Sequence, residues 1–393
     1  MHDYLYLFPS QHEMGLLEIV EKGSSRPSQF LTALTQAVIG QSKACAKVLG
    51  QGSSGQVEDR RFAPQKRRLK LAQRTAVIPL VVKIITSSDG PLHPDFSIPL
   101  LLKVQCHRGK VVVTSCIDFT DDRLSCPAGY GVVNEIVALL LTNKLYENLS
   151  PHFTYFDGWA FCKGSPTTVE LFLERADRDL DGTLQGWSMQ GVLLKNEHVD
   201  SIILPVLHSL WLMHKHYNMS HYDCFVRNIF VIRTPKYIWK QDLGEITHFA
   251  YHVEDFTFYI PNVGFIIKMG DFGTATFEYG KTAFRNTYAD ATDKKFAGFT
   301  GNGKKPHPDW LQYLSDIVER FSGMQTVEKM KTLYPFKAVM GVSVSEMVRD
   351  DFIAYNAESK LLPSLKDVII TLASHLTEPP DKSQSTLLHI HDR

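Results

Sequence analysis

Two short apolar runs, each joined to a polar loop, constrain the fold of this chain more than any other feature. One loop carries an acid, Asp223, and an amide, Asn228, and leads directly into the apolar residues Ile229–Ile232. A second apolar run, Phe265–Met269, is followed by the acid Asp271. Short apolar runs bounded by polar and glycine residues are typical of buried strands. The sequence therefore predicts two core strands that present carboxylate and amide oxygens at their ends.

Composition narrows the class of protein. The 393 residues are 44% hydrophobic and 21% charged, which is ordinary for a folded chain. Lys+Arg and Asp+Glu both number 42, so no net charge favours nucleic acid or a membrane surface. No apolar run reaches the roughly 18 residues of a spanning helix, and the N-terminus lacks the basic start of a secretion signal. We expect a soluble intracellular protein that binds no nucleic acid, with its cysteines reduced.

A glycine-rich stretch follows a predicted strand. Gly50, Gly52 and Gly55 are followed by Val57 in the pattern G-x-G-x-x-G-x-V. Glycine lets the main chain lie close over phosphates, because it has no Cβ to clash. An amphipathic helix, which a dinucleotide-binding fold would require, does not follow. We therefore expect a loop between two strands that covers the phosphates of a nucleotide.

Two lysines, Lys83 and Lys103, lie in apolar stretches after this loop. Lys83 lies near the end of the apolar run 76–85, which predicts a strand, and Lys103 lies in a second apolar stretch. A lysine in a strand is usually an edge residue with a buried stem. Alternating apolar residues within 86–130 predict an inserted β-hairpin around 107–109. Because the insertion separates Lys83 from the next predicted helix by a long stretch, Lys103 remains an alternative candidate for the role of Lys83.

An acid and a polar connector complete the candidate set. Glu135 lies near the start of a helix predicted from 134 to 145, where the helix dipole favours an acid and where it could also pair with a lysine. Two strands are predicted next, within 153–161 and 168–180, the second followed by a polar connector. This connector contains Glu174, Ala176 and Asp179.

In this order the motifs resemble those of the protein-kinase family, over about residues 46–320. The resemblance implies that Asp223 orients and deprotonates an acceptor hydroxyl, while Asn228 and Asp271 hold Mg²⁺. It implies that Lys83, fixed by Glu135, binds the α- and β-phosphates of ATP. The other nucleotide contacts that it implies are Gly50, Gly52, Gly55, Val57, Glu174, Ala176 and Asp179.

The resemblance also implies an α+β, bilobal protein-kinase-like fold with ATP between the lobes. The small lobe, 41–173, would hold an antiparallel sheet and one helix, with an insertion at about 86–130. The larger lobe, 174–378, would be mainly helical, with an insertion at about 233–260. An N-terminal extension (1–40) and a flexible tail (379–393) would flank the two lobes.

The segment after Gly273 is polar up to about residue 305, and we expect a long loop there, as in an activation segment. A helix predicted over 307–318 begins near Asp309, which could cap that helix and brace the loop around Asp223. Further helices are expected near 324–333, 343–355 and 363–376. Possible phosphorylation sites are Thr282, Thr287, Tyr288 and Thr292.

The chain departs from the family pattern within the loop. Tyr222 stands where the family has arginine, and Phe225 stands where it has a phosphate-contacting lysine. Arg227 could supply the missing charge, and no A-P-E motif closes the later segment. Together with the insertions, these departures resemble the divergent serine/threonine kinases of large DNA viruses. That resemblance would place the protein in the host cytoplasm or the virion.

Three functions stay open at this point. The first is ATP- and Mg²⁺-dependent transfer of the γ-phosphate to serine or threonine hydroxyls of protein substrates. The second is a pseudokinase that binds nucleotide and acts as a scaffold or regulator, because Tyr222 and Phe225 break the pattern. The third is a kinase that acts on small molecules or lipids.

Overall fold

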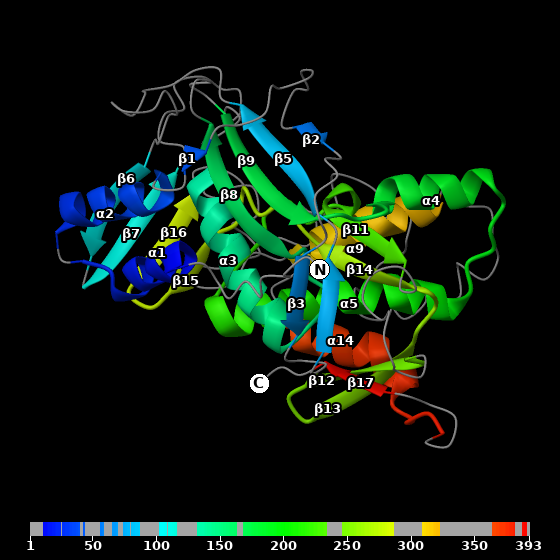
Figure 1. The fold of residues 1–393 in the computed structure, drawn as a ribbon. Helices are drawn as coiled ribbons and strands as arrows, with labels where there is room; N and C mark the ends of the chain where they lie inside the picture. Colours follow the sequence, from blue (N-terminus) through cyan, green and yellow to red (C-terminus); the bar gives the residue numbers. More distant parts are fainter. Residues whose placement is uncertain are drawn as a thin grey trace.

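Helices and small sheets make up the described part of the chain, and its strands form five sheets (Figure 1). The structure is a computed structural model. It describes residues 11–24, 26–39, 42–43, 56–58, 65–69, 74–78, 80–86, 102–107, 109–115, 132–162, 168–233, 246–286, 309–322, 364–381 and 387–390.

The largest sheet has the strand order β1-β8-β9-β5-β2. These strands are β1 (Ser42–Lys43), β8 (Phe156–Cys162), β9 (Thr168–Glu174), β5 (Leu80–Thr86) and β2 (Gln56–Glu58). All neighbours are antiparallel except β1 and β8, which are parallel. Helix α3 (Val132–Asn148) is fixed to β8, because the Asn143 amide donates to the Phe156 carbonyl at 2.6 Å and accepts from its N–H at 2.9 Å.

The single strand predicted over 76–85 is wrong. Strand β4 (Arg74–Ile78) pairs with β3 (Gln65–Leu69), whereas β5 begins at Leu80 and pairs with β2 and β9. Pro79 stands between the two strands, and proline has no N–H to donate to a ladder. The chain therefore leaves one sheet after Ile78 and enters another at Leu80.

The N-terminal helices and the insertion form a second layered unit. Helices α1 (Gln11–Lys22) and α2 (Pro27–Ile39) lie beside a four-stranded sheet of order β15-β16-β7-β6 (Figure 1). Its strands are β15 (Phe277–Tyr279), β16 (Thr282–Asn286), β7 (Lys110–Ser115) and β6 (Leu102–His107). The predicted hairpin of the insertion is confirmed as β6 and β7.

The loop predicted after Gly273 is wrong for residues 277–286. These residues form the β15–β16 hairpin, because β7 offers a free edge with which β16 pairs in parallel. Thr282, one of the possible phosphorylation sites, is buried there with 1% of its surface exposed. Thr287, Tyr288 and Thr292 lie outside the described residues.

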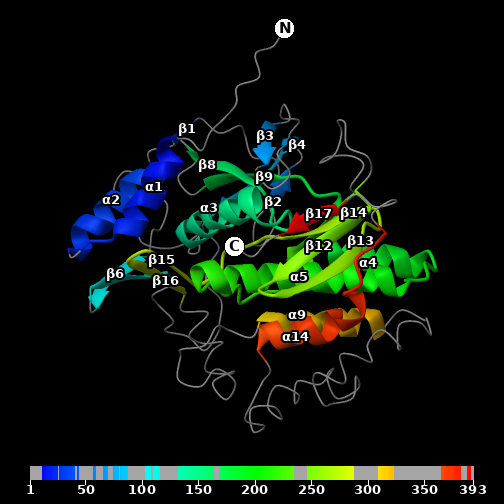
Figure 2. The same ribbon diagram turned by 90° about the horizontal axis from the view of Figure 1, so that it is seen from below.

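Helix α5 (Asn196–Tyr217) is the central helix of the second half of the chain. Its residues from Ile202 to Leu210 are buried without interruption, as expected of a helix that is covered on all sides. Three other helices lie around it (Figure 2). They are α4 (Leu180–Met189), α9 (Asp309–Ser322) and α14 (Leu365–Ala373), which continues as the short helix η2 (Ser374–Leu376).

Two three-stranded sheets complete this half. One has the order β10-β11-β14, with β10 (Arg178–Asp179), β11 (Ile229–Arg233) and β14 (Phe265–Met269). The other has the order β13-β12-β17, with β13 (Phe256–Pro261), β12 (His248–Val253) and β17 (Leu387–Ile390).

The flexible tail predicted over 379–393 does not fit residues 387–390, because β17 pairs in parallel with β12. The helix predicted near 363–376 is present as α14 and η2. Those expected near 324–333 and 343–355 lie outside the described residues. Among the helices that the structure describes, none has the length and apolar character needed to cross a bilayer.

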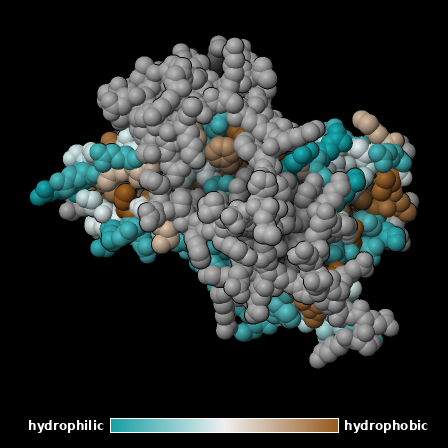
Figure 3. Space-filling model, in the orientation of Figure 1, coloured by the Kyte–Doolittle hydropathy of each residue, from teal (hydrophilic) through white to brown (hydrophobic). Residues whose placement is uncertain are grey.

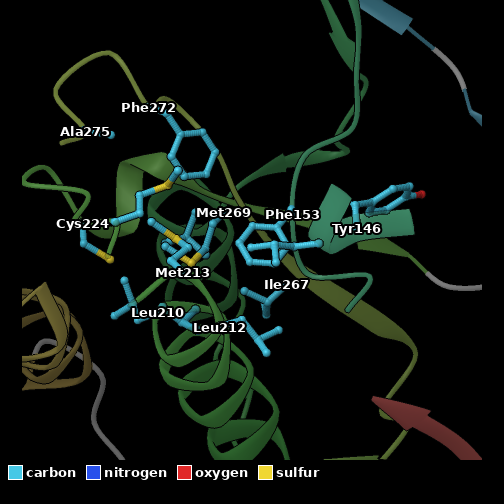
Figure 4. Close-up of a cluster of buried hydrophobic side chains, with 14 of the residues drawn as sticks. Tyr146, Phe153, Leu210, Leu212, Met213, Cys224, Ile267, Met269, Phe272 and Ala275 are labelled. Carbon is cyan, nitrogen blue, oxygen red and sulfur yellow. The ribbon is translucent and has the colours of Figure 1, made fainter. Parts of the chain in front are cut away.

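A cluster of buried side chains joins these elements beneath the candidate site (Figure 4). Leu210 and Met213 of α5 meet Met269 of β14, with Phe153 and Phe272 beside them. All five are fully buried. This core fixes the end of β14, from which Asp271 emerges.

The described surface carries one notable apolar group at the end of α4 (Figure 3). Met189 and Leu193 are 86% and 56% exposed, and Val192 lies between them in the chain.

Candidate functional site

Lys83, Glu135 and Asp271 meet in a three-residue ion cluster. The Lys83 ammonium lies 2.7 Å from the Glu135 carboxylate and 2.7 Å from the Asp271 carboxylate. Lys83 comes from β5, Glu135 from the first turn of α3, and Asp271 from the loop after β14. The structure thus brings Lys83 together with two carboxylates that lie 52 and 188 positions later in the chain.

Burial and charge set the protonation of this cluster. Burial disfavours the Lys83 charge, but the two carboxylates outweigh it and raise its pKa above the ordinary value. Burial raises the pKa of Glu135, which Lys83 offsets only in part. Burial also opposes the charge of Asp271, but Lys83 overcomes it and lowers that pKa. Asp271 is the most open of the three, with 42% of its side chain exposed.

The alternative lysine, Lys103, lies on β6 in a different sheet, where it pairs with Thr114. The structure therefore favours Lys83 as the partner of Glu135. Val57 lies on β2 directly opposite Lys83. The chain that follows the glycine-rich stretch thus runs beside the lysine, while Gly50, Gly52 and Gly55 themselves lie outside the described residues.

The loop around Asp223 is held by its own polar side chains. The Asn228 amide donates to the Asp223 carboxylate at 2.8 Å and to its main-chain carbonyl at 2.8 Å. The Arg227 guanidinium lies 2.9 Å from the other carboxylate oxygen and 4.9 Å from the centre of the Phe225 ring. Arg227 therefore does supply a positive charge at Asp223, where Phe225 carries none.

Helix α9 braces this loop from one side. The Asp309 carboxylate, which is fully buried, accepts the N–H groups of His221 at 2.6 Å and Tyr222 at 2.8 Å. Gln312 accepts from Cys224 at 2.8 Å, and Asp316 accepts from Val226 at 2.7 Å. The bracing role predicted for Asp309 is confirmed. Gln312 and Asp316 were not foreseen, although their i+3 and i+7 spacing from Asp309 places all three on one helix face.

The loop is also tied to the strand that carries Asp271. The His221 imidazole lies 2.9 Å from the Gly270 carbonyl, and the Gly270 N–H donates to the Asn228 carbonyl at 3.1 Å. Tyr222 and Asp271 have φ angles of 63° and 58°, in the left-handed region that residues with a side chain rarely adopt. Such strain persists only where surrounding contacts enforce it, and it often marks functional sites.

The connector after β9 has an unforeseen buried ion pair. The Glu174 carboxylate lies 2.6 Å from the Lys268 ammonium and accepts the Tyr155 N–H at 3.1 Å. Burial lowers the pKa of Lys268, and Glu174 counteracts this effect. A lysine inside the otherwise apolar run of β14 was the available signal, because a buried charge needs a partner.

This pair limits the contacts that the connector can offer. The Glu174 N–H donates to the Tyr155 carbonyl at 2.7 Å, so a predicted adenine contact at Glu174 rests on its carbonyl oxygen. The Asp179 carboxylate accepts the Gly182 N–H at 2.6 Å and caps α4. Ala176 lies between them, partly exposed. The contacts predicted for these residues with adenine and ribose stay predictions.

The donor set fits the chemistry of Mg²⁺. In the described residues, no three His, Cys, Asp or Glu side chains gather as a metal site. Mg²⁺ does not require such a group, because it commonly takes one or two protein oxygens together with water and phosphate oxygens. The Asn228 amide nitrogen is committed to Asp223, which leaves its carbonyl oxygen for a cation. Asp271 offers a second, half-exposed oxygen donor.

Comparisons with known proteins give one relevant similarity. No protein-family model matches the chain. The chain is 22% identical over 262 residues to the protein named Probable serine/threonine-protein kinase 380R, from Invertebrate iridescent virus 6. The matched part is 62% of this chain but only 44% of that relative, so the chain spans less than half of the relative's length. The similarity suggests a kinase-like function for this chain.

Proposed function

We propose that the protein is a serine/threonine kinase that transfers the γ-phosphate of ATP to protein hydroxyls with Mg²⁺. The observation that carries the proposal is the cluster in which Lys83 bridges Glu135 and Asp271 at 2.7 Å each. In phosphoryl transfer the protein mainly positions groups and neutralises charge. A charged lysine held between two carboxylates is prepared to receive phosphate oxygens.

The assigned roles follow from the geometry of the other residues. Asp223, 20% exposed and oriented by Asn228 and Arg227, would hold the acceptor hydroxyl and take its proton. Asn228 and Asp271 would hold Mg²⁺, which supplies charge neutralisation on the phosphates when bound. Arg227 is placed to offset charge next to Asp223, in the absence of a lysine at Phe225.

The proposal includes a bilobal protein-kinase-like fold. The β1-β8-β9-β5-β2 sheet with α3 would be the small lobe, and the part built around α5 would be the larger one. ATP would lie where β5, α3 and the loops after α5 and β14 converge. The similarity to a protein named as a probable serine/threonine kinase supports the kinase part of this proposal. A place among the divergent viral kinases, acting in the host cytoplasm or the virion, is a further part of the proposal that rests on the departures at Tyr222 and Phe225 and on the insertions.

A pseudokinase is the second candidate, and specific residues favour it. Tyr222 is buried, with 5% of its surface exposed, and Phe225 brings no charge to the loop. A protein of this kind would bind nucleotide and regulate a partner without transferring phosphate. The Arg227–Asp223 contact is the observation that favours an active enzyme over this reading.

The deciding experiment measures transfer of phosphate from radiolabelled ATP to a mixture of generic protein substrates. We expect the wild type to label serine and threonine, and Lys83→Met and Asp223→Asn each to remove the label. Lys195→Met is a matched control, because the exposed Lys195 forms an ion pair with Glu197 at the start of α5, outside the cluster. Binding of Mg²⁺–ATP without any labelling would favour the pseudokinase. Labelling that survives both active-site changes would overturn the proposal.

A further inference from the structure

The end of helix α1 lies against the turn of the β15–β16 hairpin, a few residues after Asp271. The Lys281 N–H donates to the Glu21 carbonyl at 2.9 Å, and the Thr282 hydroxyl donates to the Val20 carbonyl. The Lys281 carbonyl in turn accepts the Val111 N–H at 2.8 Å. The turn is therefore held by main-chain groups from both the N-terminal helix and the inserted hairpin.

Gly280 allows this close approach. Its φ is +57°, and a Cβ at this position would lie 2.2 Å from the Glu21 carbonyl oxygen and 2.7 Å from the Glu21 Cα. Neither distance is compatible with a side chain, and the obstructing atoms are main chain that cannot turn aside. The contact of α1 with the hairpin therefore depends on a glycine at this position.

Tyr279 connects the same turn to the helix that carries Glu135. The Lys144 ammonium of α3 donates to the Tyr279 hydroxyl at 2.7 Å and lies 4.7 Å from the centre of its ring. The Tyr279 hydroxyl also lies 3.4 Å from the Glu21 carboxylate. At the other end of α3, the Asn134 amide donates to the Ala275 carbonyl at 3.1 Å. Helix α3 is thus tied at both ends to the segment after Asp271.

The helix pair is firmly seated on this unit. Leu16 and Val20 of α1, and Leu34 and Val38 of α2, are fully buried. The Trp159 indole of β8 donates to the Val38 carbonyl at 2.7 Å, which links α2 to the five-stranded sheet. Figure 1 shows both helices beside the β15-β16-β7-β6 sheet, with α3 next to it.

We propose that the helix pair α1–α2 is an internal clamp that positions α3 and the segment after Asp271. Through Glu21, Gly280 and Tyr279 it would hold Glu135 against Lys83. The N-terminal helices would thereby order the segment after Asp271. Tyr222, in the neighbouring loop, carries no charge that could do so. The expected effect on catalysis rests on the proposed function. The expected positioning of α3 by the helix pair does not.

The first test replaces Gly280 with alanine in the full chain. The matched control is Gly109→Ala, because Gly109 lies in the β6–β7 turn of the same sheet, has a φ of +79°, and has open space around it. Both variants carry the strain of a left-handed alanine, but only Gly280→Ala meets Glu21. We expect Gly280→Ala to lower kcat/KM for ATP by about tenfold or more, and the control to change it by less than about twofold.

The second test removes a single hydroxyl and does not threaten the fold. Tyr279→Phe keeps the ring against Lys144 but loses the hydrogen bonds to Lys144 and Glu21. Tyr259→Phe on β13 is the matched control. We expect Tyr279→Phe to raise KM for ATP with an unchanged melting temperature, because Glu135 would hold Lys83 less firmly. A role in folding alone would instead change the melting temperature and leave KM unaltered.

Hydrogen exchange separates failure of the clamp from failure of the proposed function. We expect both variants to speed amide exchange in residues 132–148 of α3 and in 277–286, relative to their controls. This result would support the clamp even if the wild type transfers no phosphate, an outcome that contradicts only the proposed function. The clamp would be overturned if Gly280→Ala and Tyr279→Phe both showed the same amide exchange in α3 and the same kinetics as their control variants.

Discussion

At the scale of single residues, Arg227 is the informative substitution in the loop. It follows Asp223 by four positions and reaches its carboxylate at 2.9 Å, while its guanidinium covers the Phe225 ring at 4.9 Å. An arginine stacked on an aromatic ring is held in place on two sides. Phe225 therefore supports the Arg227 side chain. Under the proposed function, Arg227 would supply the positive charge that the family pattern has as a lysine at position 225.

Arg227→Ala should lower kcat for phosphate transfer by about 10- to 100-fold, the range for losing one positioned polar group at a reacting centre. KM for ATP should change little, because Arg227 contacts Asp223 and Phe225, whereas Lys83 is held by Glu135 and Asp271. Steady-state kinetics measure the effect. Arg233→Ala, at the exposed end of β11, is the control, and an equal loss in both variants would contradict the role of Arg227.

The buried pair of Lys268 and Glu174 also acts at this scale. Both side chains are almost fully buried, with 1% and 2% exposed, and Lys268 lies 4.3 Å from the centre of the Tyr146 ring. Removing one partner of such a pair leaves an isolated charge without water. The pair joins the connector after β9 to the strand before Asp271, so both sides of the proposed nucleotide site depend on it.

Lys268→Met should reduce the free energy of unfolding by about 3–5 kcal/mol, because Glu174 is left as an uncompensated buried charge. The double variant Glu174→Gln/Lys268→Met should recover more than half of this loss, since glutamine can still accept the Tyr155 N–H. Urea denaturation of the wild type, both single variants and the double variant gives the coupling. Additive losses in the double variant would show that the two charges do not depend on each other.

At the scale of elements, α9 and the loop at 221–228 form one unit. Three side chains on one face of α9 accept four loop N–H groups. An irregular loop has few main-chain carbonyls that can accept its own N–H groups. Buried N–H groups without acceptors reduce stability. The helix therefore fixes the shape of the loop, including the strained Tyr222.

Gln312→Ala tests this support at one acceptor. The Cys224 N–H, in a fully buried residue, would lose its partner, and the free energy of unfolding should fall by about 1–3 kcal/mol. Gln185→Ala on α4 is the control, because the exposed Gln185 side chain donates to the Asp181 side chain at 3.1 Å and its loss should change stability by less than about 0.5 kcal/mol. Equal denaturation midpoints for Gln312→Ala and the wild type would refute the support.

The elements that were predictable are those with a local signal. The helices that begin near Val132 and Asp309 and the two strands at 229–232 and 265–269 follow from apolar residues within the segment itself. The β15–β16 hairpin was not predictable, because its apolar partner β7 lies more than 160 positions earlier in the chain. The break between β4 and β5 has a local cause, because Pro79 has no N–H to donate. The apolar residues on both sides of Pro79 nevertheless favoured one continuous strand.

At the scale of the whole molecule, the candidate site is assembled from segments far apart in sequence. Order and spacing of motifs were enough to choose Glu135, Asp223, Asn228 and Asp271, because each motif has a local pattern. The sequence alone did not exclude Lys103 as an alternative to Lys83, because the choice depends on which strand lies next to α3. Lys268 was visible as a lysine within an apolar strand, but its pairing with Glu174 was not predictable, because residues that pair across different sheets follow no rule of sequence spacing.

Because the cluster residues come from separate parts of the chain, nucleotide binding should stabilise the molecule as a whole. A ligand that binds only the folded state at 100 times its Kd adds about 2.7 kcal/mol to stability. We therefore expect Mg²⁺ with a non-hydrolysable ATP analogue to raise the melting temperature by several degrees. The analogue without Mg²⁺ should give a smaller rise, because phosphate charge then faces Asp271 without a cation between them.

Asp271→Asn separates the metal contribution from that of the nucleotide. The variant keeps a side chain of the same size but loses the charge that attracts Mg²⁺, so the extra stabilisation by the metal should disappear while that of the analogue alone persists. Asp255→Asn, at the exposed turn between β12 and β13 and outside the site, should retain the full Mg²⁺ effect. A Mg²⁺-dependent rise in Asp271→Asn equal to that of the wild type would remove Asp271 from the proposed metal site.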